Sequence, residues 1–147
     1  MAAENKAVDE VQIRGLIENK IKAVRAKDID GATSDYAADV LSFDVINPLR
    51  YIGADAIRKR LEDWFSSFQG SVGLEIRDLS ITVGEAVAFS HCLNHVSATT
   101  TSGGKLDMWW RETACYRKID GKWIITHQHS SVPFDAESGK ASLDLKP

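Results

Sequence analysis

Asp44 is the residue whose type and setting point most directly to chemistry. It lies near the end of an apolar segment, residues 40–46, that is typical of a β-strand. Apolar neighbours remove water from a carboxylate and disfavour its charged form, which makes it a stronger base for removing a proton from carbon. The alternative is that Asp44 caps the turn before Pro48 or faces solvent, and the residues alone leave both interpretations open.

A second candidate is an arginine in the C-terminal half. Strand alternation places Arg111 on one face of the segment 106–119. We expect that face to line a pocket, where the guanidinium would hold or stabilise a developing oxyanion. The alternative is that Arg111 pairs with Glu112 or Asp107 on an exposed strand. The choice of face also depends on β-bulges, which reverse the alternation.

Two histidines offer either metal binding or proton transfer. His127 and His129 lie two residues apart on a predicted strand, which puts them ~6.6 Å apart on one side. A metal ion held by both would need a third ligand from Asp44, His91 or His95. We favour proton transfer by His129, because an imidazole titrates close to neutral pH. The prediction is therefore that the chain binds no metal and no cofactor.

Further side chains could complete a pocket around these groups. They are aromatic residues and residues that share the chosen strand faces: Tyr36, Trp64, Phe68, His95, Trp109, Thr113 and His127. The alternative for the aromatic ones is that they simply belong to the core. Trp110 would point away from Trp109, and it could mark a surface between two copies of the chain.

Composition limits the classes of function. A chain of 147 residues suits one domain, and its formal net charge of −3 provides no basic surface for nucleic acid. No apolar run approaches the ~20 residues of a membrane span, and the polar N-terminus lacks the apolar core of a signal peptide. The two cysteines, Cys92 and Cys115, fit neither a disulfide framework nor a zinc site, so we expect a reducing cytoplasmic location.

Hydrophobic periodicity predicts helices first and strands later. The predicted helices cover residues 7–27, a short stretch from Asp30 to Tyr36, and a segment after Gly53 that ends at Gly70. The predicted strands cover residues 40–46, 74–83, 86–98, 106–119 and 123–132, with an Asp120-Gly121 hairpin turn. This order indicates an α+β fold, in which one curved antiparallel sheet wraps around the long N-terminal helix. The helices would close the sheet into a cone with a pocket at its open end.

Several short motifs occur in an order that is typical of one superfamily. They are Ala26-Lys-Asp-Ile-Asp-Gly31, Tyr36-Ala-Ala-Asp39, Gly53-Ala-Asp-Ala-Ile57, Arg111-Glu-Thr113 with Arg117-Lys-Ile-Asp-Gly-Lys-Trp123, and His127-Gln-His129-Ser-Ser131-Val-Pro133. From about Val8 to Phe134 the chain resembles the NTF2-like superfamily, in its SnoaL-like and ketosteroid-isomerase-like branch. The resemblance implies the cone-shaped NTF2-like fold and a homodimer that forms through the sheet.

The resemblance also bears on the chemistry. Aligned without gaps on Tyr36-Ala-Ala-Asp39, Asp44 takes the position of the steroid isomerases' general base. Those enzymes use a tyrosine from the first helix and a protonated aspartic acid from a later strand as oxyanion donors. The same alignment places Lys20 at the first of these positions and about Thr113 at the second. The resemblance therefore implies pocket chemistry other than steroid isomerisation.

We expect one SnoaL-like domain at residues 1–134 and a polar tail at 135–147, which would lie over the surface or a partner subunit. The expected function is that of an isomerase, lyase or hydratase acting on a small, largely apolar carbonyl compound, with Asp44, His129 and Arg111 as the catalytic residues. The alternative is a non-catalytic module of the same fold that binds a small molecule or another copy of the chain.

Overall fold

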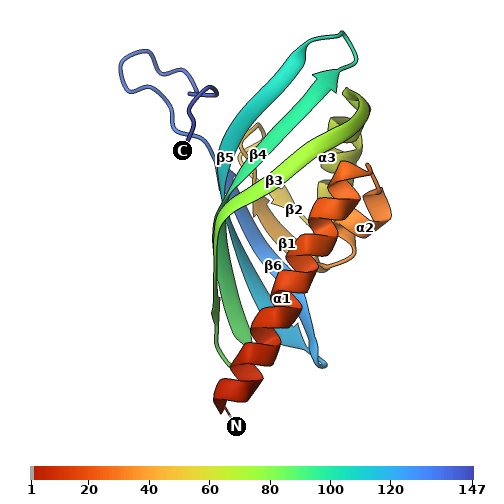
Figure 1. The fold of residues 1–147 in the computed structure, drawn as a ribbon, viewed down its shortest axis with the longest axis vertical. Coiled ribbons are helices and arrows are strands. Elements are labelled where there is room, and N and C mark those ends of the chain that lie inside the picture. Colours follow the sequence, from red (N-terminus) through yellow and green to blue (C-terminus); the bar gives the residue numbers. More distant parts are fainter. Residues whose placement is uncertain (1) are drawn as a thin grey trace.

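The computed structural model describes residues 2–147 and confirms the α+β prediction (Figure 1). The helices are α1 (Ala2–Arg25), α2 (Ile29–Thr33) and α3 (Ala54–Ser66). The strands are β1 (Tyr36–Phe43), β2 (Tyr51–Ile52), β3 (Phe68–Val83), β4 (Val87–Thr100), β5 (Lys105–Ile119) and β6 (Lys122–Ser131). None of the helices in this range is long and apolar enough to cross a membrane.

The six strands form one curved sheet in the order β2-β1-β6-β5-β4-β3. The prediction of a purely antiparallel sheet needs one correction, because β1 runs parallel to β6 while every other neighbouring pair is antiparallel. The chain enters β1 from α2, and β6 is the last strand of the β3–β6 meander, so no hairpin fixes their relative direction. The sheet does not close on itself, and α1 crosses its concave side (Figure 1).

Two element boundaries that matter for the site differ from the predicted ones. β1 covers Tyr36–Phe43, not residues 40–46, so Asp44 follows the strand. The short helix α2 is capped by Asp28, whose Oδ1 accepts a hydrogen bond from the Gly31 backbone N–H at 3.1 Å, and not by Asp30. The helix ends at Thr33, so the chain is extended by Tyr36 and can pair with β6.

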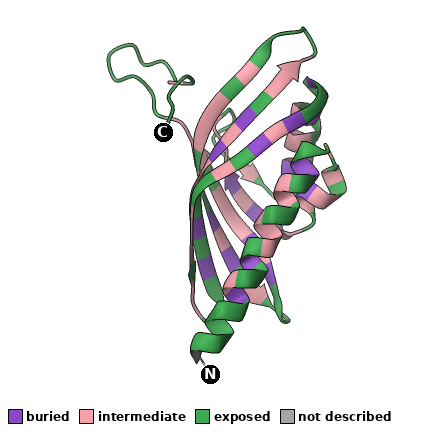
Figure 2. Ribbon diagram, in the orientation of Figure 1, coloured by how far each residue is buried: buried purple, intermediate pink, exposed green. Residues whose placement is uncertain are grey.

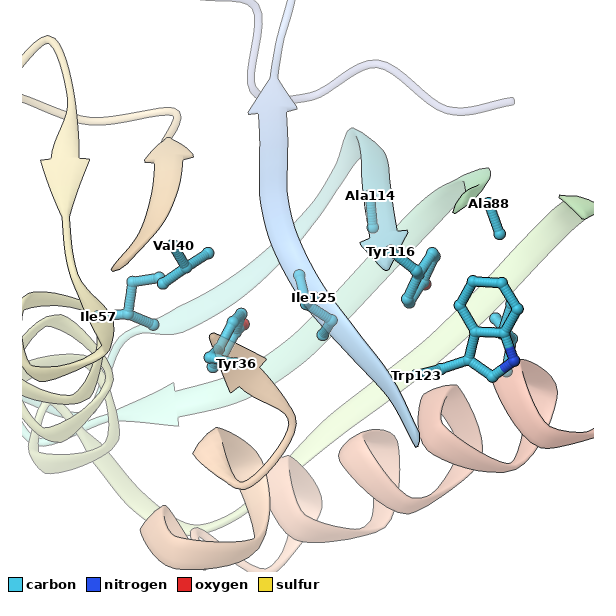
Figure 3. Packing of buried hydrophobic residues seen from close by; sticks show 9 residues of the cluster. Tyr36, Val40, Ile57, Ala88, Ala114, Tyr116, Trp123 and Ile125 are labelled. Carbon is cyan, nitrogen blue, oxygen red and sulfur yellow. The ribbon is translucent and has the colours of Figure 1, made fainter. Parts of the chain in front are cut away.

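The core lies between α1 and the concave face of the sheet, in two clusters. Figure 2 shows buried residues alternating with exposed ones along the strands, as expected for a sheet with one covered face. In Figure 3, Tyr36, Ile125, Tyr116 and Trp123 lie side by side above α1, in one buried cluster that also contains Ile13. A second cluster, which includes Val24, Phe65 and Val96, lies where α1, α3, β3 and β4 meet.

Polar contacts fix α1 at both ends. Near its start, the buried Asp9 accepts hydrogen bonds from Lys118 Nζ at 2.9 Å and Trp123 Nε1 at 3.1 Å. Near its end, Arg25 Nε donates to the Leu74 carbonyl oxygen at 2.8 Å, and just beyond it Lys27 Nζ donates to that of Phe68 at 2.7 Å. The side chains in the middle of α1 are thereby held against the sheet.

A β-bulge in β6 determines which of its side chains face inward. Cys115 pairs with His127 and Tyr116 with Ile125, so Thr126 has no opposite residue in β5. Before the bulge, Trp123 and Ile125 are buried on the concave side. After the bulge the even-numbered residues of β6 face inward in place of the odd-numbered ones, because one extra residue shifts the alternation of side chains by one position.

Candidate functional site

A cavity of about 570 Å³ lies between α1, α3 and the concave face of the sheet. Its walls are mostly aliphatic and aromatic, with contributions from α1, α3 and β3–β6. The charged residues that line it within residues 2–147 are Lys20, Asp44, Arg60 and Glu112. A mainly apolar cavity of this size with a few polar groups is typical of sites for small molecules.

Asp44 lines this cavity, as the sequence suggested, but its surroundings are not simply apolar. It continues the inward alternation of the buried residues Val40 and Ser42. Its Oδ2 accepts a hydrogen bond from Arg60 Nε of α3 at 3.1 Å, and its Oδ1 accepts one from the Val45 backbone N–H at 2.6 Å. The carboxylate is about one-fifth exposed, so it is paired with a cation and still reachable from the cavity.

A second polar group surrounds Lys20, which the sequence did not mark as a site residue. The Lys20 ammonium donates hydrogen bonds to the Tyr36 hydroxyl and, at 3.4 Å, to Gln128 Oε1. The Tyr36 hydroxyl in turn donates to Gln128 Oε1 at 2.8 Å, and Gln128 Nε2 donates to Ser42 Oγ at 3.2 Å. Burial by itself would lower the pKa of Lys20, but its attraction to Tyr36 and Glu112 outweighs burial and holds that pKa above the usual value.

Polar residues of β4 and β5 form a third group in the cavity wall. Asn94 Nδ2 donates to Glu112 Oε2 at 2.5 Å, and Ser90 Oγ and the Tyr116 hydroxyl are 2.9 Å apart. Burial raises the pKa of both the Cys92 thiol and the Tyr116 hydroxyl to about 12. Both groups are therefore protonated at neutral pH, which excludes Cys92 as a thiolate nucleophile.

The predicted face of β5 and β6 is not the one that lines the cavity. Arg111 and Thr113 are exposed on the convex side, whereas the neighbouring Trp110, Glu112 and Ala114 line the cavity. The inward acidic residue closest to the steroid-isomerase position is consequently Glu112. Arg111 Nε instead donates to Ser131 Oγ at 3.1 Å.

The histidines of β6 lie on the same outer side. The bulge at Thr126 places Gln128 and Ser130 in the cavity wall, so His127 and His129 point away from it. Their rings contact Phe43 edge-on, with centroids 4.9 and 5.4 Å away. His129 and Arg111 are therefore separated from Asp44 by the sheet, and the predicted catalytic trio does not come together.

His95 and Trp109 also lie outside the cavity. Their rings stack with centroids 4.5 Å apart and planes 5° from parallel. His95 Nδ1 is 2.6 Å from Glu75 Oε1, and His95 Nε2 is 2.7 Å from Asp107 Oδ1. Hydrogen bonds to Glu75 and Asp107 raise the pKa of the His95 imidazole.

The remaining predicted pocket residues are on the inner side. Tyr36 and Trp64 line the cavity. Phe68 is buried behind the wall and packs edge-on against Trp64, with centroids 5.3 Å apart. Trp110 lines the cavity instead of an outer surface, and its ring meets that of Trp64 edge-on at 6.4 Å.

The sequence contains a signal for Lys20 that the periodicity analysis missed. The apolar positions of α1 that line the cavity are residues 16, 17, 21 and 24, and position 20 falls on the same face. A lysine within an apolar helical stripe must place its ammonium either in the interior or beyond the interior, in solvent. Arg60 carries a similar signal, because it precedes Leu61 and lies one turn before Trp64 on the inner face of α3.

Within residues 2–147, no group of three or more His, Cys, Asp or Glu side chains is arranged to hold a metal ion. The two β6 histidines have ring centroids 6.5 Å apart, and His127 Nδ1 lies 2.7 Å from the Leu41 carbonyl oxygen. That nitrogen is therefore engaged by the backbone of β1.

The C-terminal tail contributes to the cavity of its own chain. Ala141 and Leu143 are part of the lining. The tail turns back after Pro133, where the Ser142 backbone N–H donates to the Pro133 carbonyl oxygen at 2.7 Å and Phe134 forms a β-bridge with Ala141. In Figure 1 the tail leaves the sheet where β6 ends.

Comparisons with known proteins place this geometry in a family. Residues 13–135 match the SnoaL-like domain. The structure of an NTF2-like protein of unknown function from Pseudomonas putida KT2440 has 34% sequence identity and a TM-score of 0.87, over 96% of this chain and 98% of that chain. Among curated proteins, none matches the chain.

More distant structures share the fold alone. A ketosteroid isomerase-like protein from Erwinia carotovora atroseptica is 18% identical, with a TM-score of 0.70 over 82% of this chain and 93% of that one. The association domain of CaMKII from C. elegans is 14% identical, with a TM-score of 0.67 over 88% of this chain and 99% of that one. The fold is therefore compatible with an enzyme or a binding module. The match over residues 13–135 and the 34% identity to the Pseudomonas protein show that this chain belongs to the SnoaL-like domain family and has the NTF2-like fold.

Proposed function

We propose that this protein is an acid/base enzyme of the isomerase, lyase or hydratase kind, acting on a small, largely apolar carbonyl compound. The observation that carries the proposal is the position of Asp44, a partly exposed carboxylate in the wall of a mainly apolar cavity of about 570 Å³. Such a cavity excludes bulk water around an apolar substrate, and a carboxylate in its wall can accept a proton from carbon.

In this proposal Asp44 removes or relays the proton, and Arg60 keeps its carboxylate oriented between turnovers. Arg60 Nε and the Val45 N–H each hold one carboxylate oxygen, which limits rotation of the group. His129 and Arg111 are left without a catalytic role, since both lie on the convex side of the sheet.

The test is deuterium uptake at the α-carbon of a panel of apolar ketones and enones, followed by NMR. Asp44→Asn removes the base with little change in volume, and the rate should fall by about 10²–10⁴-fold. Asp39→Asn is the matched control, because Asp39 is an exposed residue of β1 and should leave the rate unchanged. A substrate that exchanges equally fast with wild type and Asp44→Asn would refute the mechanism.

A second candidate function is that of a non-catalytic module that self-associates through the sheet. It is supported by the convex side, which carries the stacked His95–Trp109 pair and Phe89, the latter 46% exposed. The CaMKII association domain from C. elegans has the same fold. Static light scattering tests this second function. Wild type and Val11→Glu, which changes α1, should be dimers, whereas Phe89→Glu, which changes the convex side, should be a monomer.

Binding of a small molecule without turnover in the same cavity is supported by the contacts that its two carboxylates already make. Asp44 and Glu112 are already engaged, by Arg60 and Asn94 respectively.

The free thiols of Cys92 and Cys115 are compatible with a reducing location such as the cytoplasm, which we include in the proposal. We also propose that residues 1–134 form a single SnoaL-like domain and that residues 135–147 form a tail.

A further inference from the structure

We propose that Lys20, Tyr36 and Gln128 form a carboxylate-binding site, so that the ligand of the cavity is an apolar molecule carrying a carboxylate group. The inference rests on the proposed function in one respect, namely that the cavity takes a small molecule. It adds the chemical class of that molecule and the residue that selects it, and it needs no turnover to be correct.

The geometry around Lys20 leaves one of its donors for a ligand. An ammonium has three N–H donors. Lys20 uses two of them, on the Tyr36 hydroxyl and Gln128 Oε1, and among the described residues no third acceptor is within hydrogen-bonding distance. Gln128 Nε2 likewise has two N–H groups, of which Ser42 Oγ accepts one. Both residues line the cavity, so a carboxylate there could accept from the ammonium and the amide.

The charge of Lys20 also lacks a direct counter-ion. None of the ion pairs within residues 2–147 includes Lys20. Of the two carboxylates in the cavity wall, Asp44 pairs with Arg60, and Glu112 accepts from Asn94. Because no carboxylate in the described part of the chain contacts the ammonium directly, an anion bound beside Lys20 would make the first direct ion pair at this position.

The Lys20 amine is held in its charged form. Although burial alone would lower its pKa, Tyr36 and Glu112 raise that pKa above the usual value. A protonated amine has no free electron pair, so Lys20 is unsuited to forming a Schiff base with a carbonyl group. Permanent positive charge is instead suited to holding an anionic oxygen by charge-assisted hydrogen bonds.

The surroundings of Lys20 specify the rest of the ligand. Leu16, Ile17 and Ile21 flank it on the inner face of α1, and Trp64 of α3 and Trp110 of β5 belong to the same cavity lining. These side chains offer no hydrogen-bonding groups apart from the indole N–H, and they favour contact with an alkyl or aryl body. An apolar acid matches both the charge and the walls, whereas a sugar matches neither and a polyanion does not match the apolar walls.

The experiment compares octanoate with octanamide, which have the same chain and nearly the same shape but differ in charge. Because Trp64 and Trp110 line the cavity, quenching of tryptophan fluorescence reports binding. Wild type should bind octanoate on the order of 10- to 100-fold more tightly than octanamide, the range expected for a hydrogen-bonded charge pair. Lys20→Met should remove this preference, and Lys22→Met, which changes an exposed lysine of the same helix, should keep it.

Equal affinity of wild type for octanoate and octanamide would overturn the inference without any variant, so a folding defect of Lys20→Met cannot hide the answer. A preference for octanoate that persists in folded Lys20→Met would also overturn it, because another cation would then bind the carboxylate. Neither result tests the role of Asp44 as a base, which is measured separately by deuterium exchange. Conversely, loss of that role would leave the octanoate preference intact.

Discussion

Charged residues in the cavity wall differ in how their charge is balanced. Asp44 and Arg60 pair with each other, Glu112 accepts a hydrogen bond from Asn94, and Lys20 donates hydrogen bonds to Tyr36 and Gln128. Chemistry that requires a basic oxygen therefore belongs near Asp44, and recognition of an anionic oxygen belongs near Lys20. The convex side carries a different arrangement, in which His95 bridges two carboxylates.

That bridge predicts a pH dependence of stability. Glu75 and Asp107 raise the pKa of His95 above 6.5, the value for an unfolded chain. The stabilisation is therefore complete below about pH 6.5 and is lost as the pH rises through the raised pKa of the folded protein. His95→Gln should lower the melting temperature more at about pH 6 than at about pH 9. Equal decreases at the two pH values in calorimetry would mean that the imidazolium contributes nothing.

At the scale of elements, the sequence predicts the helix-then-strand order well, because periodicity and turn residues are local properties. The inner faces of β5 and β6 were not predictable in the same way. Two residues of β6, His127 and Gln128, exchange sides because of one unpaired residue, Thr126. Nothing about a threonine in a strand marks a bulge, since its position is set by the pairing of β6 with both β1 and β5.

Lys20 shows the opposite case, in which a local pattern contained the information. Its position on the apolar face of α1 follows from helical spacing alone. The partners that make it a site, Tyr36 and Gln128, are 16 and 108 residues away in the sequence, so their contact depends on the parallel pairing of β1 with β6. Arg60 likewise meets Asp44 only once α3 has packed against the sheet.

The anchoring of α1 gives a prediction at this scale. Asp9→Ala would leave the buried Trp123 N–H without an acceptor and Lys118 without its partner, and should lower the free energy of unfolding by about 1–3 kcal/mol. Glu10→Ala is the control, because Glu10 is half exposed and pairs only with Arg14 across one turn. Urea unfolding that shows equal losses for the two variants would contradict this role of Asp9.

The Asp9 contribution should also depend on pH. The hydrogen bond from Lys118 lowers the pKa of Asp9 despite burial, so the folded protein holds the ionised form to lower pH than the unfolded chain does. The stabilisation is present above the unfolded value of 3.8 and disappears as the pH falls through the lowered pKa.

For the whole molecule, the sheet, the helices α1 and α3, and the tail all contribute residues to the lining of the large cavity. Tail residues 135–147 are exposed apart from the half-buried Ser142, and two of them, Ala141 and Leu143, also line the cavity of their own chain. The tail's position is held by the backbone hydrogen bonds around Pro133, since none of its side chains is buried. Segments with so few buried contacts open at low free-energy cost, so the tail is suited to admitting and retaining a ligand.

This arrangement predicts that the tail slows ligand release. Leu143→Ser should increase the dissociation rate of octanoate several-fold in stopped-flow fluorescence, because an apolar part of the wall is lost. Leu145→Ser is the matched control: Leu145 is as exposed as Leu143, at 53% and 51%, but is not part of the lining. Identical rates for both variants and wild type would show that the tail does not retain the ligand.

The most direct test of the account is calorimetric titration of wild type and Asp44→Asn with a panel of phenols, which imitate the enolate of a carbonyl substrate. Asparagine resembles the protonated base that exists once the proton has been transferred. If Asp44 is the base of a cavity for small carbonyl compounds, at least one phenol should bind Asp44→Asn as tightly as wild type or more tightly. Absence of binding to both proteins, or weaker binding to Asp44→Asn throughout the panel, would contradict the central claim.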